Sequence, residues 1–181
     1  MDIIRPIDTE RLIIRCFEQS DWPGFLKFMT DPAATRNLLF SEDMRTENGA
    51  RALFESTIES YSTDVPIHAY AVALKNNSFI GSCGFSGIDE AAGIYECYYT
   101  LLPEFWNSGY ATEATKALID YCFLVFRIDE MRAYVSAENP ASSKVAERAG
   151  MKYLGVQEHP LTGIRSEVYA IEAPDSGHQG T

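Results

Sequence analysis

The stretch PEFWNSGYATEATKAL, residues 103–118, places a proline and a glycine-containing turn directly before a run with helical periodicity. Pro103 has no N–H to donate, so it ends the pairing of the strand before it. Gly109 tolerates a positive φ and lets a ligand approach the main chain closely. The first helical turn then leaves N–H groups unsatisfied beside a partial positive charge. The stretch therefore predicts a strand-to-helix turn that is able to bind a pyrophosphate.

A second interpretation of this turn needs no ligand. Asn107 or Ser108 could cap the helix, with water on the remaining amides. Other nucleotide-binding motifs are excluded, because the chain has no G-x-x-x-x-G-K-[ST] sequence. Its glycines at 81, 84 and 87 do not form G-x-G-x-x-G.

Hydrophobic periodicity outward from the turn predicts a mixed layout of strands and helices. Strands are expected at residues 11–17, 68–74, 78–85, 93–102, 131–137, 152–158 and 166–173, and helices at 20–31, 47–62, 109–126 and 139–150. In the last helix, Asn139 is the predicted N-cap, Pro140 the first residue and Gly150 the stop. The fold class is therefore α/β (α+β), with helices packed on one central sheet.

Length and composition favour one domain, residues 1–173, followed by a flexible tail at 174–181. The formal net charge of −11 argues against a general affinity for nucleic acid. It suits cationic substrates such as amines. One acidic segment could favour such a substrate or form a solvated loop face. Its carboxylates are Asp31, Glu42, Asp43 and Glu47.

The four cysteines are far apart and form no C-x-x-C pair, which argues against a zinc site. We expect buried, reduced thiols, which suit the cytoplasm. Charges at Asp2, Arg5 and Asp8 are incompatible with a signal-peptide core. The longest apolar run, YCFLVF, has six residues, so no membrane span is predicted.

Three segments in order resemble the RimJ/RimL-type branch of the Gcn5-related N-acetyltransferases (GNAT). TERLIIRCFEQSDWPGF is similar to the opening strand and helix of that branch. ECYYTLLPEFWNSGYATEA is similar to its fourth strand and pyrophosphate loop, and NPASSKVAERAGM to a later cofactor-facing helix. The resemblance covers residues 9–171. It implies a mixed, mostly antiparallel sheet of about 6–7 strands with about four helices on both faces.

The resemblance also implies acetyl-CoA as co-substrate, no metal, and an amine acceptor that is a protein N-terminus or a small molecule. Asn107 and Ser108 depart from the branch, which often has Gly-Lys there. This costs backbone freedom and a possible phosphate contact. Main-chain groups at Tyr99, Thr100 and Leu101 would hold the pantetheine, and the Asn139 side chain would hydrogen-bond it as well as capping its own helix. Ser142 would lie at the sulfur. The pyrophosphate would be held by the loop residues Trp106, Asn107, Ser108, Gly109, Tyr110, Ala111 and Thr112.

Direct acetyl transfer to an amine needs a base that frees the amine of its proton and an acid near the leaving thiolate. Glu96 is the one carboxylate inside the strand before the turn, and the family often has a glutamate there. It could equally face solvent or pair with a cation across the sheet. Simple alternation puts it on one face with Tyr98 and Thr100, unless a bulge reverses that order. Glu158 is a second candidate base.

Ser142 stands where RimL-like enzymes have a serine proposed to act on the sulfur, although serine is also common near helix starts. His68 and His159 have no partner at a recognisable spacing, so both are predicted to be structural. The leading hypothesis is an acetyl-CoA-dependent N-acetyltransferase, either monomeric or homodimeric. The alternative is a catalytically silent acyl-CoA-binding or regulatory module of the same fold.

Overall fold

A single eight-stranded sheet, in the order β1-β2-β3-β4-β5-β6-β8-β7, organises residues 4–174. In the computed structural model, which describes residues 4–174, the strands are β1 (Ile7–Asp8), β2 (Leu12–Arg15), β3 (Ala69–Leu74), β4 (Phe79–Asp89), β5 (Ile94–Leu101), β6 (Glu130–Val135), β7 (Lys152–Glu158) and β8 (Arg165–Glu172). The predicted mixed, mostly antiparallel sheet is confirmed. It has one strand more than predicted, because the two residues of β1 are too few to show a period. The predicted tail at 174–181 lies outside the described residues from 175 onward.

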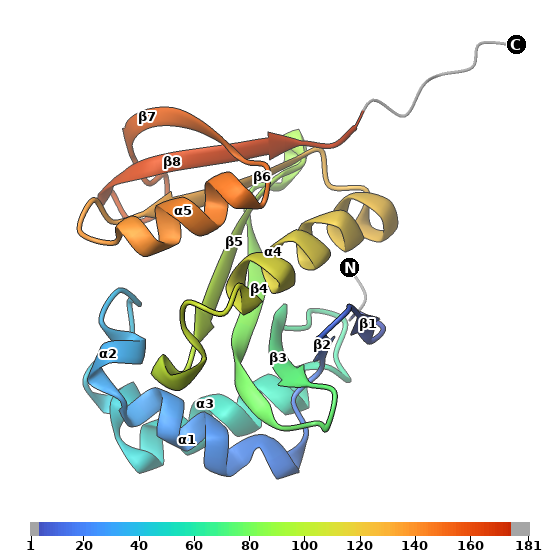
Figure 1. Cartoon of the computed structure of the whole chain (residues 1–181), viewed down its shortest axis with the longest axis vertical. Coiled ribbons are helices and arrows are strands. Elements are labelled where there is room, and N and C mark those ends of the chain that lie inside the picture. Colours follow the sequence, from blue (N-terminus) through green and yellow to red (C-terminus); the bar gives the residue numbers. More distant parts are fainter. Residues whose placement is uncertain (1–3, 175–181) are drawn as a thin grey trace, which may run out of the picture.

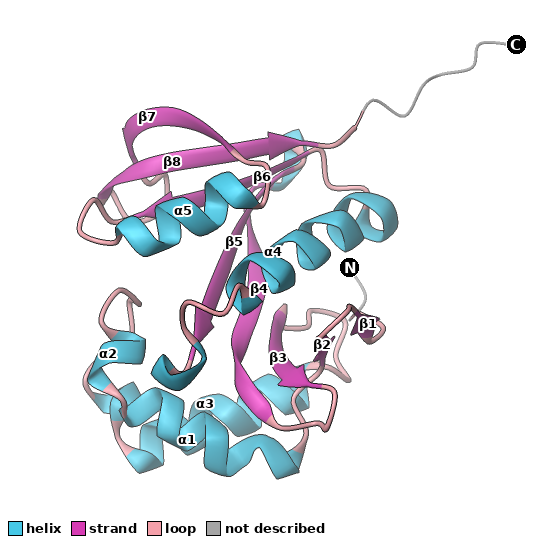
Figure 2. Cartoon of the chain, in the orientation of Figure 1, coloured by secondary structure: helices cyan, strands magenta, loops and turns pink. Residues whose placement is uncertain are grey.

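In the described part of the chain, five α-helices pack around this sheet: α1 (Trp22–Thr30), α2 (Pro32–Thr35), α3 (Glu47–Ser60), α4 (Tyr110–Tyr121) and α5 (Pro140–Arg148) (Figure 2). The short α2 was not expected from periodicity. Its start is fixed locally, because the Asp31 side chain accepts hydrogen bonds from the N–H groups of Ala33 and Ala34. The predicted helix at 109–126 is α-helical to Tyr121 and continues as a π-helical turn, Cys122–Phe126.

Two hydrophobic cores lie on opposite faces of the sheet. Alternate residues of β3 belong to different cores, Tyr70 to one and Ala71 to the other, as the period of a strand requires. The first core includes Leu118 of α4 and Ala146 of α5. The second core includes Phe54 of α3 and is rich in phenylalanine from α1. The predicted packing of helices on both faces is therefore confirmed.

Strands β5 and β6 form the parallel pair of the sheet, and α4 makes the connection between them that parallel strands need. Their pairing is short, running from Ile94 opposite Glu130 to Glu96 opposite Arg132. On its other side β5 stays paired with β4 as far as Leu101. The two strands therefore part after Glu96 (Figure 1).

Side chains alternate regularly along β5. Its register with β4 is continuous from Tyr95 to Leu101, and the irregularity lies earlier, between Gly87 and Asp89 of β4. Thr100 donates from its Oγ1 to the carbonyl of Ala34 in α2. The alternation that groups Glu96 with Thr100 is therefore confirmed, and a reversing bulge within this part of β5 is wrong.

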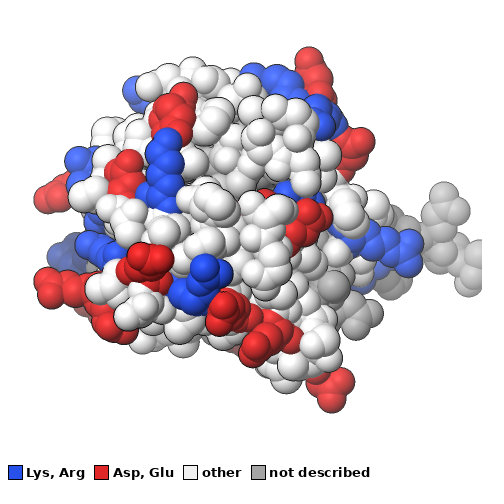
Figure 3. Space-filling model, turned by 90° about the horizontal axis from the view of Figure 1, so that it is seen from below, with Lys and Arg blue, Asp and Glu red and all other residues white. Residues whose placement is uncertain are grey.

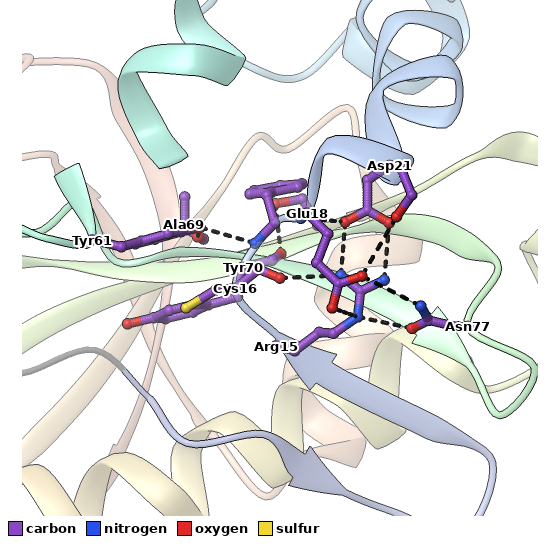
Figure 4. Close-up of polar contacts among 11 residues, drawn as sticks. Arg15, Cys16, Glu18, Asp21, Tyr61, Ala69, Tyr70 and Asn77 are labelled. Atoms are coloured by element: carbon purple, nitrogen blue, oxygen red, sulfur yellow. Dashed lines mark hydrogen bonds and ion pairs between the residues drawn. The ribbon is translucent and has the colours of Figure 1, made fainter. Parts of the chain in front are cut away.

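A buried ion pair joins the end of β2 to the start of α1 (Figure 4). Arg15 donates from Nη1 to Asp21 Oδ2 at 2.7 Å and from Nη2 to Oδ1 at 2.9 Å. Its Nε donates to Asn77 in the turn between β3 and β4. The hydrogen bond to Asp21 raises the pKa of Arg15, so the guanidinium remains charged. One arginine thus connects the end of β2 and the start of α1 to the turn between β3 and β4, 62 positions further along the chain.

The thiols largely fit the prediction. All four cysteines are free, and Cys83, Cys97 and Cys122 are buried. Cys16 is only half-buried, so its prediction as a buried thiol is wrong. It directly follows the last residue of the short strand β2. Burial raises the pKa of Cys97 to about 12, which keeps this thiol protonated at neutral pH.

Lysine, arginine and carboxylate side chains are interspersed on the face seen from below, without a continuous basic surface (Figure 3). Within residues 4–174, no group of three or more potential ligands forms a metal site. No helix in that part of the chain is long and apolar enough to cross a membrane.

We predict that Asp21→Ala lowers the free energy of unfolding by about 3–5 kcal/mol, because it leaves the buried Arg15 charge with only the half-exposed Glu18, 3.6 Å away, as an ion-pair partner. Urea denaturation monitored by circular dichroism measures this loss. Glu55→Ala is the matched control, since it removes a more exposed partner, that of Arg51 at 3.8 Å. We expect that change to cost less than about 1 kcal/mol. Equal effects of the two substitutions would contradict this view of the ion pair.

Candidate active site

The parting of β5 and β6 leaves one edge of β5 without a strand partner beyond Glu96. Leu102 N–H donates to Ile80 of β4, so alternation turns the main chain of Leu101 and Tyr99 the other way, into the gap. An extended ligand could bind this edge as an added strand. The three predicted pantetheine contacts are therefore not equivalent. Tyr99 faces the gap, whereas the main chain of Thr100 is directed toward β4.

Leu101 has a further role at the gap. Its carbonyl accepts a hydrogen bond from the indole Nε1 of Trp106 at 2.8 Å. Trp106 therefore fixes the turn against the end of β5, and the Leu101 carbonyl is already occupied. The N–H of Leu101 is left facing the gap.

The turn before α4 has the geometry of an anion site. Gly109 is the N-cap with φ 80°, and no side chain caps the helix in the described structure. Ser108 Oγ is bonded to the carbonyl of Trp106 instead. The interpretation in which Asn107 or Ser108 caps α4 is therefore wrong. The first-turn amides of Tyr110, Ala111 and Thr112 are the groups that a pyrophosphate would use.

Asn107 occupies the position at which the resemblance implies a glycine. It adopts φ 59°, in the left-handed region that asparagine tolerates better than most residues. The backbone freedom lost with glycine is therefore not needed for this conformation. Ser108 carries no positive charge in place of the lysine that the resemblance implies at its position.

Arg11, which sequence reasoning missed, lies against this turn. Its Nη1 donates to the Ser108 carbonyl at 2.8 Å, and its Nε donates to Glu113 Oε2 at 2.7 Å. The guanidinium also lies over the ring of Tyr110, 4.5 Å from its centroid. Arg11 and Glu113 are 102 positions apart, so no local pattern could have paired them.

The opposite wall of the gap is the start of α5. Asn139 caps this helix as predicted, accepting from Ser142 N–H at 3.3 Å. Asn139 Nδ2 also donates to Ser142 Oγ at 2.8 Å. Tyr99 reaches across from β5 and donates its hydroxyl to the Ser142 carbonyl at 2.8 Å. The structure thus brings Tyr99, Asn139 and Ser142 together, with Ser142 Oγ acting as an acceptor and its own proton free to be donated.

Glu96 lies where the two strands part, with 23% of its side chain exposed. Its Oε2 is 2.7 Å from Nε2 of His159. On the far side of the imidazole, Nδ1 accepts the N–H groups of Leu161 and Thr162 at 3.1 and 3.3 Å. These two donors place the ring proton on Nε2, which therefore donates to the Glu96 carboxylate.

The sequence shows no partner spacing for His159, but its imidazole is hydrogen-bonded to Glu96 in the structure. His159 lies in the loop between β7 and β8, and tertiary packing alone brings it to β5. His68, by contrast, is stacked on Phe85 with ring centroids 4.4 Å apart. Burial lowers the pKa of His68 to about 4, as fits its predicted structural role. Glu158 is exposed at the end of β7 and pairs in register with Arg165.

A family model described as Acetyltransferase (GNAT) domain matches residues 11–152. The chain belongs to the GNAT acetyltransferase family. This match confirms the resemblance to the RimJ/RimL-like branch. An uncharacterized N-acetyltransferase from Bacillus licheniformis is 30% identical over 76% of each chain.

Solved structures agree with this assignment. A GNAT-family acetyltransferase from Bacillus anthracis has a TM-score of 0.77 and 25% identity, covering 93% of this chain and 99% of its own. The RimL ribosomal-protein acetyltransferase in complex with coenzyme A has a TM-score of 0.75 at 18% identity, covering 93% of this chain and 98% of its own. At that identity it supports the fold alone.

GNAT enzymes use acyl-CoA, and the residues of this chain fit such a ligand. The edge of β5 at Tyr99 is open, and the turn before α4 is uncapped. A Cβ built on Gly109 would meet one group, Arg11 Nη2 at 3.3 Å, so the main chain is accessible there.

We predict that Gly109→Val weakens coenzyme A binding at least about tenfold, because valine strains a left-handed position and crowds the turn. Isothermal titration calorimetry measures the affinity. Gly155→Val is the matched control, since Gly155 has φ 96° with no atom within 4 Å of an added Cβ and belongs to the edge strand β7. Unchanged affinity in Gly109→Val would remove the turn from the binding site.

Proposed function

We propose that the protein is an acetyl-CoA-dependent N-acetyltransferase that transfers an acetyl group directly to a primary amine. One observation carries the proposal: the hydrogen-bonded Glu96 carboxylate lies where β5 and β6 part, on the strand that leads into the uncapped turn. This arrangement supports a base and an acyl-CoA site on one continuous segment of chain. Membership of the GNAT family supports the same chemistry.

Glu96 is the proposed general base. His159 occupies Oε2 and orients the carboxylate, while Oε1 has no protein partner among the described residues. Oε1 can therefore take a proton from the incoming ammonium, directly or through one water, and leave a neutral amine. Because Leu161 and Thr162 hold the tautomer of His159, the carboxylate has one fixed orientation.

Ser142 is the proposed acid. When bound, acetyl-CoA supplies an activated acetyl group as a thioester. The Asn139 amide donates to Ser142 Oγ, so the serine hydroxyl proton is directed away from Asn139 and can reach the sulfur. In the overall balance the amine nitrogen loses two protons. One appears on the CoA thiol and the other leaves to solvent through Glu96.

The acceptor is proposed to be a protein N-terminus or a small-molecule amine. The named activity of RimL toward a ribosomal protein favours neither, because the chains share 18% identity. The acidic segment gives limited support for a cationic amine, since Asp31 is already used as a helix cap. Glu42, Asp43 and Glu47 are exposed, as in an ordinary solvated face. The four free thiols support a reducing compartment such as the cytoplasm.

We predict that Glu96→Gln lowers kcat by about 10²–10⁴-fold, because the amine loses its proton acceptor. Thiol release from acetyl-CoA, measured with peptides, polyamines and aminoglycosides as acceptors, provides the readout. Glu158→Gln is the control, and we expect it to leave the rate unchanged.

An unchanged rate and pH profile in Glu96→Gln would exclude Glu96 as the base. The proposed activity itself is tested with the wild-type chain on the same panel of acceptors. If the wild-type chain binds acetyl-CoA but no acceptor on the panel is turned over, the silent binding module is favoured.

A further inference from the structure

We propose that Arg11 is a phosphate-binding residue of the acyl-CoA site and supplies the positive charge that Ser108 does not. The inference rests on the proposed function, because it assumes that the turn before α4 holds the pyrophosphate. Arg11 lies in the turn between β1 and β2, far in the sequence from the loop that it serves.

The contacts of Arg11 leave one donor directed at the loop. Nε is bonded to Glu113 and Nη1 to the carbonyl of Ser108. Nη2 has no hydrogen-bond partner among residues 4–174, and it is the atom that a Cβ on Gly109 would meet at 3.3 Å. A planar guanidinium fixed through two of its nitrogens is suited to present the third to a phosphate oxygen.

The position of the guanidinium is also set independently of any ligand. Stacking over Tyr110 holds it above the first residue of α4. The side chain is 41% exposed even with these contacts, so a ligand can reach it. Its charge therefore adds to the partial positive charge at the helix start.

Charges of both signs lie near the turn. A surface hollow beside the turn is lined by Gly109, Lys116 and Arg148, and also by the carboxylates of Glu113 and Asp120. Burial alone would raise the pKa of Glu113, but hydrogen bonds from Thr9 and Arg11 hold it below its usual value. Glu113 is therefore a carboxylate at neutral pH that competes with a phosphate for Arg11.

This competition separates a ligand contact from a structural brace. If Arg11 binds phosphate, removing its charge weakens binding, whereas Glu113→Gln, which removes the competing charge but keeps an oxygen that can accept from Arg11 Nε, does not. If Arg11 only braces the loop through Glu113, both substitutions break the same brace and weaken binding alike.

The test is calorimetric titration of the full chain with coenzyme A and, separately, with pantetheine, which has no pyrophosphate. We expect Arg11→Gln to weaken coenzyme A binding by about 10–100-fold, the loss of a charge-assisted hydrogen bond, and to leave pantetheine binding unchanged. Glu113→Gln should leave coenzyme A affinity unchanged or raise it. Arg51→Gln removes another half-exposed arginine and serves as the charge control.

Arg11→Lys keeps the positive charge but loses the planar guanidinium. This variant should retain more affinity for coenzyme A than Arg11→Gln. If Arg11→Gln does not fold, the coenzyme A affinities of Arg11→Lys and Glu113→Gln are compared instead. We then expect Arg11→Lys to bind coenzyme A more weakly than Glu113→Gln. Weakening of coenzyme A binding in Glu113→Gln equal to or greater than that in the Arg11 variant would overturn the proposal. Wild-type chain that binds no coenzyme A would instead overturn the proposed function on which it rests.

Discussion

The short parallel contact between β5 and β6 is the constraint on which the site depends. Three residue pairs join the strands, and beyond Glu96 each strand follows its own half of the sheet. The first core contains side chains from both halves, such as Val72 and Met131, and Tyr99 spans the gap to α5 through a hydrogen bond to Ser142. The same divergence exposes the main chain of β5 and places Glu96 at the point where the two strands part. It also directs β5 into the turn at Gly109.

The site therefore combines groups of two kinds. The turn at Gly109 and the edge of β5 are main-chain features, which bind a ligand through amides and carbonyls and tolerate substitutions such as Asn107 and Ser108. The proposed chemical groups are side chains held by a second contact. His159 orients Glu96, and Asn139 orients Ser142. An acidic chain with a net charge of −11 also needs local cations to attract an anionic ligand, which gives Arg11 its proposed importance.

Local features of the sequence predicted most of the fold. The strand before the turn, the left-handed Gly109 and the Asn139 cap each depend on a few neighbouring residues, and periodicity or capping chemistry is enough to find them. The sequence also resembled its family at these places. It could not predict the Glu96–His159 and Arg11–Glu113 pairs, because each joins residues far apart in the chain. Isolated histidines and arginines have no period that would reveal their partners. The short β1 and α2 were missed for a related reason, since their few residues contain too little pattern.

A crystal structure of the chain with bound coenzyme A tests the central claim most directly. We expect the pantetheine to lie in the gap between β5 and β6, with hydrogen bonds to the main chain of Tyr99. The pyrophosphate should contact the amides from Gly109 to Thr112, with the thiol close to Ser142. Coenzyme A bound elsewhere on the molecule, with the edge of β5 beyond Glu96 free of contacts, would contradict the account.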